Sequence, residues 1–329
     1  MQTLNNFKEA FNSIDENNFE EFALQLFYFQ YKNNPVYKSY VDYLGLRVKN
    51  TKSTNEIPFL PIEFFKKFEI KTCSWKSQTT FMSSGTTASV RSRHHVEDLY
   101  FYRQNTLMNY ERFFDSVSDT TILALLPSYQ EQGNSSLIDM VDYFMSRSNS
   151  VHSGYYLDDY EGLNKAIELA SKHNKSVVLF GVSFALLEYA KFAKNQNKDI
   201  IVIETGGMKG RGPEYTKMEM YDILKQGLNV REVYSEYGMT ELMSQAYSKG
   251  AGLFQTPYCM KVDIRDVNDP FKYLEVNKTG SVNVIDLANI HSCAFIETQD
   301  LGVKRENKKF EILGRIDNSD LRGCNLLVS

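Results

Sequence analysis

The sequence predicts an α/β fold in which helices flank a parallel sheet, followed by a smaller β-rich region. Three short apolar runs are typical of buried strands, at residues 121–126 (TILALL), 176–180 (SVVLF) and 199–203 (DIIVI). Amphipathic helical patterns alternate with them, at residues 161–171, 183–193 and 213–225. Apolar strands that alternate with helices are typical of βαβ units and therefore of a parallel sheet covered by helices.

The helical patterns carry recognisable boundary residues. Residues 213–225 begin at Pro213, which suits a first helical turn, and Gly227 follows as a stop signal. Residues 17–30 place apolar side chains at three- and four-residue steps behind a first turn that contains acids, and residues 96–114 form a longer helical pattern. We therefore expect a helical start to the chain and a helix before the first buried strand.

We expect the 329 residues to form one domain, because no linker is long enough to separate independent units. Beyond residue 254 the pattern changes to short alternating strands separated by Gly, Asn and Asp. The predicted parts are a helical N-terminal region, an α/β core, a β-rich subdomain and a short tail, at residues 1–60, 61–253, 254–313 and 314–329.

The composition is that of an ordinary globular protein. The formal net charge of -4 gives no electrostatic reason to expect nucleic acid or an anionic membrane surface as partner. No apolar stretch approaches the roughly 20 residues of a membrane span, and the acidic N-terminus does not resemble a secretion signal. The four cysteines form no CxxC pair, so we expect reduced thiols in a cytoplasmic protein without structural zinc.

The first segment suited to chemistry is residues 81–87, FMSSGTT. Glycine lets the backbone approach a phosphate, and the flanking hydroxyls add donors, so this turn can wrap phosphate oxygens. Arg91, four residues further on, can supply a cation. The alternative is a solvated Ser/Thr turn, because the second glycine and the lysine of a P-loop are missing.

The second and third segments each follow an expected strand. Residues 204–212 (ETGGMKGRG) form a glycine-rich turn beyond a strand end, where a flat base or a ribose can bind, or simply a loop that needs positive φ angles. Residues 234–241 (YSEYGMTE) combine an aromatic ring that can stack on a purine with Thr240 for phosphate and Glu241 for Mg²⁺. The alternative is that Thr240 caps a following helix and Glu241 complements its dipole.

The fourth candidate consists of two short segments, TQDLG with Asp300 and GRID with Arg315. A carboxylate can take both ribose hydroxyls, and a nearby arginine can add to them, although each segment is also an ordinary turn.

In the order SSGTT, GG, YGMTE, D and GRxD, these segments resemble the core motifs of the adenylate-forming superfamily of acyl-CoA synthetases, firefly-type luciferases and peptide-synthetase adenylation domains. The resemblance implies an adenylate-forming large domain and, as substrate and metal, ATP and Mg²⁺. It implies a pyrophosphate-gripping loop, adenine contacts from the glycine pair and the YG pair, α-phosphate and metal contacts from Thr240 and Glu241, and ribose contacts from Asp300 and Arg315. The implied ATP-binding residues are Ser83, Ser84, Gly85, Thr86, Thr87, Gly206, Gly207, Glu236, Tyr237, Gly238, Met239, Asp300 and Arg315.

The sequence departs from the superfamily pattern in ways that indicate one branch. Ala88 and Arg91 stand where glycine and lysine are usual, and the sequence ends soon after GRID, so the usual C-terminal lid domain with its catalytic lysine is expected to be lacking. It resembles the acyl-protein synthetase family, the fatty-acid-activating subunit of the bacterial bioluminescence reductase. The segments that show this resemblance are residues 93–95 (RHH), residues 127–136 (PSYQEQGNSS) and residues 322–324 (RGC).

This resemblance implies that Cys324 accepts the acyl group from the adenylate as a thioester. A thiolate is a good nucleophile, and a cysteine on a short tail can move between two sites. The alternative is a small apolar residue in a terminal strand.

The expected reaction is ATP-dependent activation of a carboxylic acid, fatty or aryl, to acyl-AMP with release of pyrophosphate, and then acyl transfer to a thiol. Catalysis is expected from Arg91, Thr240, Glu241 and Cys324, with Lys209 replacing the charge of the lid lysine. The expected acyl acceptor is Cys324 and then a reductase, a carrier protein or another acceptor protein. The alternatives are direct transfer to coenzyme A or a carrier protein, and a subunit that binds nucleotide and acyl group without turnover.

Overall fold

The structure, a computed structural model, describes residues 3–46, 48–83, 90–126, 134–172, 176–194, 197–206 and 215–316. The chain folds as two compact units. Unit 1 comprises Met1–Gln78, Ala88–Glu97 and Gln255–Ser329, and unit 2 comprises Thr79–Thr87 and Asp98–Phe254. That the chain is one domain, with an α/β core at residues 61–253 and a β-rich subdomain at residues 254–313, stays a prediction.

Unit 2 contains the parallel sheet that the apolar runs predict. Its strands lie in the order β8-β7-β6-β4-β5, all parallel, and β9 pairs antiparallel with β8. The strands are β4 (Thr120–Leu125), β5 (Gly154–Tyr155), β6 (Ser176–Val182), β7 (Ile201–Thr205), β8 (Val233–Tyr237) and β9 (Ala246–Ser248), preceded in the chain by β2 (Thr79–Met82). Every residue of β4 is buried, as expected for a strand covered on both faces.

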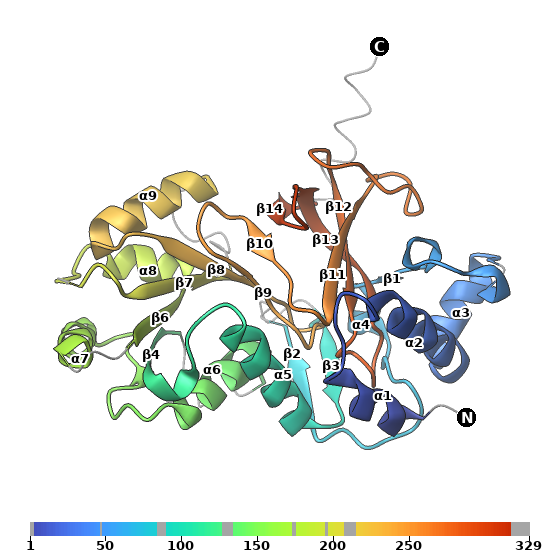
Figure 1. Cartoon of the computed structure of the whole chain (residues 1–329), viewed down its shortest axis with the longest axis horizontal. Coiled ribbons are helices and arrows are strands. Elements are labelled where there is room, and N and C mark those ends of the chain that lie inside the picture. The colour runs from blue at the N-terminus through green and yellow to red at the C-terminus, as the bar shows by residue number, and fades with distance from the viewer. Residues whose placement is uncertain are drawn as a thin grey trace, which may run out of the picture. The chain divides into compact units, whose positions relative to one another are not determined.

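Helices connect these strands. They are α5 (Leu99–Glu111), α6 (Ser136–Arg147), α7 (Tyr160–Lys172), α8 (Ser183–Tyr189) and α9 (Lys217–Leu228), with a 3₁₀ turn at Val117–Asp119. The crossovers β4–α6–β5 and β6–α8–β7 run in opposite directions across the sheet, so right-handed connections place α6 and α8 on opposite faces (Figure 1). The prediction of an α/β fold is confirmed.

The boundaries predicted for α9 were wrong. The helix begins at Lys217, because Thr216 and Glu219 form a reciprocal capping box. Gly227 lies inside the helix, where a β-carbon would come within 2.7 Å of the Ala190 Cβ and 2.9 Å of its carbonyl oxygen. The helix ends after Leu228 with Asn229 in the left-handed conformation, at φ 51°.

Unit 1 combines an antiparallel sheet with short helices. Strands β11 (Met260–Arg265), β12 (Thr279–Asp286), β13 (Phe295–Lys304) and β14 (Phe310–Arg315) pair in chain order, and β1 (Leu60–Pro61) pairs parallel with β13. The helices are α1 (Leu4–Phe11), α2 (Phe19–Asn33), α3 (Pro35–Tyr43) and α4 (Phe64–Lys67), with 3₁₀ turns at Val48–Asn50 and Thr54–Glu56. The unit also contains β3 (Arg93–Val96), and at β10 (Phe254–Gln255) the chain passes from unit 2 to unit 1.

Aromatic rings form the core of unit 1. Phe295 of β13 stacks on Tyr37 with 6.2 Å between centroids and meets Phe27 edge-on at 5.9 Å. The buried amide of Gln30 secures α2, since Nε2 donates to the Asn289 carbonyl at 2.8 Å and Oε1 accepts from the Ala294 amide at 2.9 Å. The predicted helical start to the chain therefore packs on the β-rich part of the sequence.

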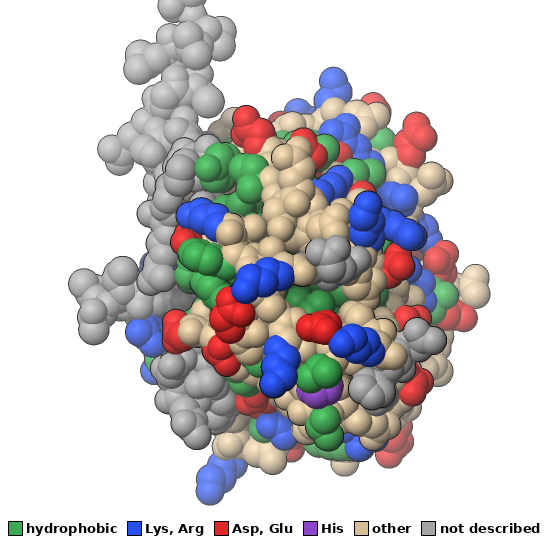
Figure 2. All heavy atoms as spheres, turned by 90° about the vertical axis from the view of Figure 1, so that its left-hand side faces the viewer, with side chains coloured by type: hydrophobic (Ala, Val, Ile, Leu, Met, Phe, Trp, Pro, Cys, Tyr) green, Lys and Arg blue, Asp and Glu red, His purple; other side chains and the backbone are tan. Residues whose placement is uncertain are grey.

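The face of the molecule in Figure 2 mixes charges of both signs. Exposed ion pairs include Lys172–Glu168 on α7 and Lys191–Glu188 at the end of α8, and such pairs stabilise the fold weakly. Among the described residues, no helix is long and apolar enough to cross a membrane.

Candidate active site

The carboxyl ends of β7 and β8 bring two of the sequence segments together. Thr205 and Glu236 are paired residues of the two strands, and the Thr205 hydroxyl donates to Glu236 Oε2. Gly206 follows Thr205 with φ 80°, a conformation that favours glycine, and is exposed. Gly206 and Tyr237 therefore leave neighbouring strands at the same sheet edge, which is where open α/β sheets bind ligands.

A buried polar network lies one residue below this edge. Glu204 is 4% exposed, and its carboxylate accepts from the Ser183 hydroxyl and, at 2.9 Å, from the Ser235 hydroxyl. Because Ser235 donates its proton to Glu204, the neighbouring Tyr221 hydroxyl must donate to Ser235. This chain of hydrogen bonds ties α8 and α9 to β7 and β8 and makes the sheet edge rigid.

Burial perturbs the acid Glu236 at this edge. Its pKa is raised from 4.5 to about 7, chiefly by burial and in part by the Glu204 carboxylate, while the hydrogen bond from Thr205 acts in the opposite direction. At neutral pH the group is therefore divided between a carboxyl that can donate and a carboxylate that can only accept.

Gly238 is fitted to the Glu236 side chain. A β-carbon at residue 238 would lie 2.3 Å from Glu236 Oε1, so any larger residue would displace the carboxylate. The glycine of the YG pair thus allows the backbone to pass close to Glu236.

No helix follows Glu241. The alternative that Thr240 caps a following helix was wrong, because the chain turns at Thr240 and Glu241 and returns as β9 beside β8. Residues 242–245 are buried in unit 2, and Glu241 itself is 5% exposed. Thr240 and Glu241 are therefore held in a turn whose far side is part of the core.

Helix α5 fixes this turn. The Asn105 amide, 1% exposed, donates to the Met243 carbonyl at 2.8 Å and contacts the Ser244 hydroxyl at 3.0 Å. The same helix is joined to α6 by Arg103, which forms two 2.8 Å hydrogen bonds to the Asp139 carboxylate.

The approach to the phosphate-loop candidate is also anchored in unit 2. Phe81 packs on Tyr102 with 4.9 Å between ring centroids, and the Met82 amide donates to the Asn134 carbonyl at 2.8 Å. Ser83, the residue after β2, is partly buried. Ser84, Gly85, Thr86 and Thr87 lie outside the described residues.

Asp300 and Arg315 lie in unit 1 as paired residues of β13 and β14, within strands, so the alternative that each segment is an ordinary turn was wrong at these two residues. Arg315 Nε is 3.6 Å from Asp300 Oδ1, and the Arg315 side chain is 82% exposed, against 12% for that of Asp300. The structure therefore joins the two predicted ribose residues, which lie 15 positions apart in the sequence.

Of the remaining predicted residues, Arg91 is exposed on the segment before β3 in unit 1. Met239 is partly buried between Gly238 and Thr240. Gly207, Lys209 and Cys324 lie outside the described residues. Cys259 and Cys293 are buried and Cys73 is exposed, all three as free thiols.

Within the described part of the chain, no group of three or more His, Cys, Asp or Glu side chains could hold a metal ion by itself. Mg²⁺ bound with a nucleotide needs only one or two carboxylates, because the phosphates supply other oxygens. Glu241, a single carboxylate in the turn after β8, fits that requirement by its chemistry.

A comparison with protein families identifies the family of this chain. The sequence model of the family described as acyl-protein synthetase, LuxE, matches residues 9–329. The chain belongs to the acyl-protein synthetase family. This confirms the resemblance drawn from the motifs. Among curated proteins, the sequence has no match.

Solved structures show that this member of the acyl-protein synthetase family has the fold of adenylate-forming enzymes. It is similar to 2-hydroxyisobutyryl-CoA ligase in complex with 2-HIB-AMP, with a TM-score of 0.64 and 11% identity over 91% of this chain and 67% of the ligase. It is also similar to ATP-bound MatB from Rhodopseudomonas palustris, with a TM-score of 0.52, 17% identity and coverage of 72% and 47%. A third similar structure is O-succinylbenzoate coenzyme A synthetase (MenE) from Bacillus subtilis in complex with AMP. Its TM-score is 0.51 and its sequence identity 15%, over 74% of this chain and 50% of MenE. The chain spans about half the length of MatB.

Sequence reasoning missed three residues that hold candidate residues of this acyl-protein synthetase: Thr205 and Asn105 in unit 2, and Thr298 in unit 1. Asn105 had a detectable signal, since it is a polar residue on the buried side of a predicted helix. Thr205 and Thr298 had no signal beyond a hydroxyl close to a motif residue. Each of these hydroxyls donates to a residue on a neighbouring strand, Glu236 for Thr205 and Val282 for Thr298.

Proposed function

We propose that this protein activates a carboxylic acid with ATP and transfers the acyl group to a thiol. A carboxylate oxygen attacks the α-phosphorus of ATP, the bond to the bridging oxygen breaks, and pyrophosphate leaves with the electron pair. A thiolate then attacks the acyl carbon of the acyl-AMP, and AMP leaves.

One observation carries the proposal: in a chain of this family and fold, Gly206 and the segment Tyr237–Glu241 emerge together from the carboxyl ends of β7 and β8. A flat base can lie against an exposed glycine and an aromatic residue, while the next turn offers a hydroxyl and a carboxylate. Burial of the residues behind the turn holds these groups in place before substrate binds.

Within unit 2, Thr240 would donate to the α-phosphate, and Glu241 would hold a Mg²⁺ ion that neutralises charge on the phosphate oxygens. Glu236, Met239 and the YG pair would line the adenine side. Ser83 to Thr87 would bind the departing pyrophosphate, and Lys209 would supply the positive charge expected from a lid domain. Arg91, which belongs to unit 1, would supply a further positive charge.

Within unit 1, Asp300 would accept hydrogen bonds from the ribose hydroxyls, and Arg315 would hold the Asp300 carboxylate as its counterion. Charged acceptors form stronger hydrogen bonds than neutral ones, which makes a carboxylate suitable for anchoring a sugar.

The first test is acid-dependent exchange of labelled pyrophosphate into ATP, across a panel of fatty, aryl and amino acids. We expect exchange with one class of acid and its loss in Glu241→Ala. Glu188→Gln is the matched control, because Glu188 is an exposed acid paired with Lys191 on the outside of unit 2. Nucleotide binding without exchange for every acid would contradict the proposal and favour a subunit that binds without turnover.

The second test concerns the thiol. Incubation with ATP and the labelled acid that supports exchange should leave a hydroxylamine-sensitive label on the denatured protein, and Cys324→Ser should remove it. Cys73→Ser is the matched control, because Cys73 is the exposed cysteine among the described residues. Exchange without any protein-bound label would instead favour direct transfer to coenzyme A or a carrier protein.

A further inference from the structure

Asp300 is carried by an irregularity in β13. Along β12 and β13, Ser281 pairs with Leu301 and Asn283 pairs with Glu297, with a register shift between these pairs. One residue of β12, Val282, therefore stands opposite three residues of β13, which are Thr298, Gln299 and Asp300. We call these three residues the β13 bulge. Bulges redirect side chains that a regular strand would point elsewhere.

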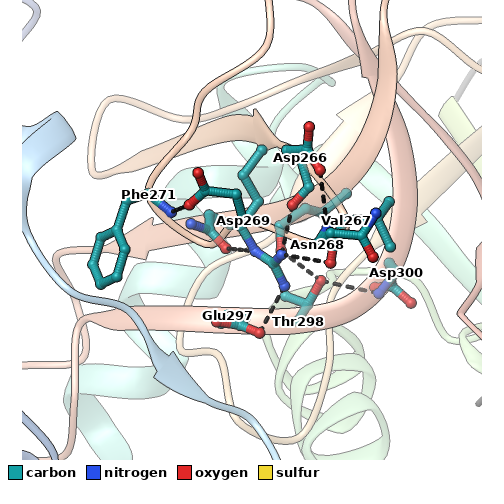
Figure 3. A network of polar contacts seen from close by, with 11 residues as sticks. Asp266, Val267, Asn268, Asp269, Phe271, Glu297, Thr298 and Asp300 are labelled. Atoms are coloured by element: carbon teal, nitrogen blue, oxygen red, sulfur yellow. Dashed lines mark hydrogen bonds and ion pairs between the residues drawn. The ribbon is translucent and has the colours of Figure 1, made fainter. Parts of the chain in front are cut away.

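The Thr298 side chain closes this bulge. Its hydroxyl donates to the Val282 carbonyl at 2.8 Å and accepts from the Asp300 amide at 3.1 Å (Figure 3). One oxygen thus joins the residue opposite the bulge to the residue that carries the carboxylate. Thr298 is 2% exposed, so water does not readily replace this link.

The two ends of the bulge are fixed independently of Thr298. Before it, Glu297 accepts from the Arg265 guanidinium at 2.6 Å, and Arg265 also donates to the Asp266 carbonyl at 2.8 Å. After it, Leu301 pairs with Ser281. The Gln299 carbonyl accepts from the Ile316 amide at 2.8 Å, which holds the middle of the bulge against the end of β14.

Asp300 also pairs with Arg315 of β14, and Arg315 Nε lies 3.6 Å from Asp300 Oδ1. Within β13, the Asp300 amide is the point at which Thr298 acts on the direction of the carboxylate. We propose that Thr298 is a positioning residue: its hydroxyl holds the β13 bulge so that Asp300 presents its carboxylate to the ribose hydroxyls of ATP. The inference rests on the proposed function, in which Asp300 is the ribose acceptor. Thr298 itself does not touch the nucleotide.

The test compares the binding of ATP and of 2′,3′-dideoxy-ATP by calorimetry. In the wild-type protein we expect ATP to bind at least roughly 10-fold more tightly, which corresponds to about 1.4 kcal/mol, because hydrogen bonds to a charged group are stronger than neutral ones. Thr298→Val keeps the shape and removes the hydroxyl, and should reduce this ratio to about 2-fold through weaker ATP binding alone. Thr298→Ser restores the hydroxyl and should restore the ratio.

Two further variants separate positioning from general damage to the sheet. Ser281→Ala is the matched control, because it removes a neighbouring buried hydroxyl that has no hydrogen-bond partner, and it should keep the wild-type ratio. Asp300→Asn should lower the ratio as Thr298→Val does, and the double variant should lower it no further.

The inference is overturned if Thr298→Val weakens both nucleotides equally, or if it keeps the wild-type ratio while Asp300→Asn loses it. Failure of the proposed function gives a different result. In that case the wild-type protein binds neither nucleotide, or binds both equally, before any substitution is made, and the inference about Thr298 is lost with it.

Discussion

The turn after β8 and the β13 bulge both present a carboxylate, but they are built in different ways. Glu241 sits on a turn whose continuation, residues 242–245, is buried and bonded to α5 through Asn105. Asp300 sits inside a strand, and one threonine hydroxyl bonds both its amide and the strand opposite. The first carboxylate is placed by the packing of a helix, and the second by a local hydrogen bond.

This difference indicates what mutations will do. Changes behind the β8 turn should alter stability and activity together, because the same side chains hold the core and the turn. Changes at the bulge should alter nucleotide recognition selectively, because its two ends are fixed by other contacts.

The largest effect is expected from Asn105→Leu. It removes the donor to the Met243 carbonyl and leaves buried polar groups without this partner. We expect the free energy of unfolding to fall by about 2–3 kcal/mol, measured by urea denaturation. Pyrophosphate exchange should fall roughly 10-fold, because small displacements of catalytic groups are costly.

Thr106→Val on the same helix is the control for this experiment. Thr106 is equally buried, but its hydroxyl donates at 2.9 Å to the Arg103 carbonyl within α5. The Thr106→Val variant should retain pyrophosphate exchange activity. If Asn105→Leu lost stability and kept full exchange, the turn would not depend on α5, and the contrast with the bulge would disappear.

An intermediate effect is expected from Glu236→Gln, and it should depend on pH. The folded-state pKa, about 7, lies above the ordinary value of 4.5, so the folded protein retains a proton that the unfolded chain releases between these values. The wild-type protein should therefore lose stability as the pH rises from about 4.5 to 7, whereas the variant avoids this loss.

Urea denaturation at pH 5 and pH 8 measures the difference. We expect Glu236→Gln to be more stable than the wild-type protein by about 2 kcal/mol at pH 8 and nearly equal at pH 5. Glu188→Gln provides the comparison for an exposed acid. An equal difference at both pH values would mean that Glu236 does not titrate in this range.

The smallest effect is expected from Gly238→Ala. The added β-carbon would meet Glu236 Oε1 and push the carboxylate away from Thr205, at an expected loss of about 1 kcal/mol in unfolding free energy. In a Glu236→Ala background the same substitution should cost much less, as a double-mutant cycle in urea would measure. Equal costs in both backgrounds would place the steric conflict elsewhere.

The sequence by itself determined the parallel sheet of unit 2 and the order of the site segments. Apolar runs such as residues 121–126 and 176–180 predict buried strands between the amphipathic helices around them, because burial on two faces requires continuous apolar character. The glycine-rich turn also indicated positive φ angles, and Gly206 adopts such an angle, which other residues adopt rarely.

Only the tertiary structure decided how the site residues are held. A helix after Glu241 was a reasonable local prediction, yet the chain returns as β9 because residues 242–245 are buried and Asn105, 138 positions before Met243, bonds the backbone there. The bulge that carries Asp300 depends likewise on Val282 of the neighbouring strand. Local propensity extends over a few residues, whereas these hydrogen bonds join segments that only folding brings together.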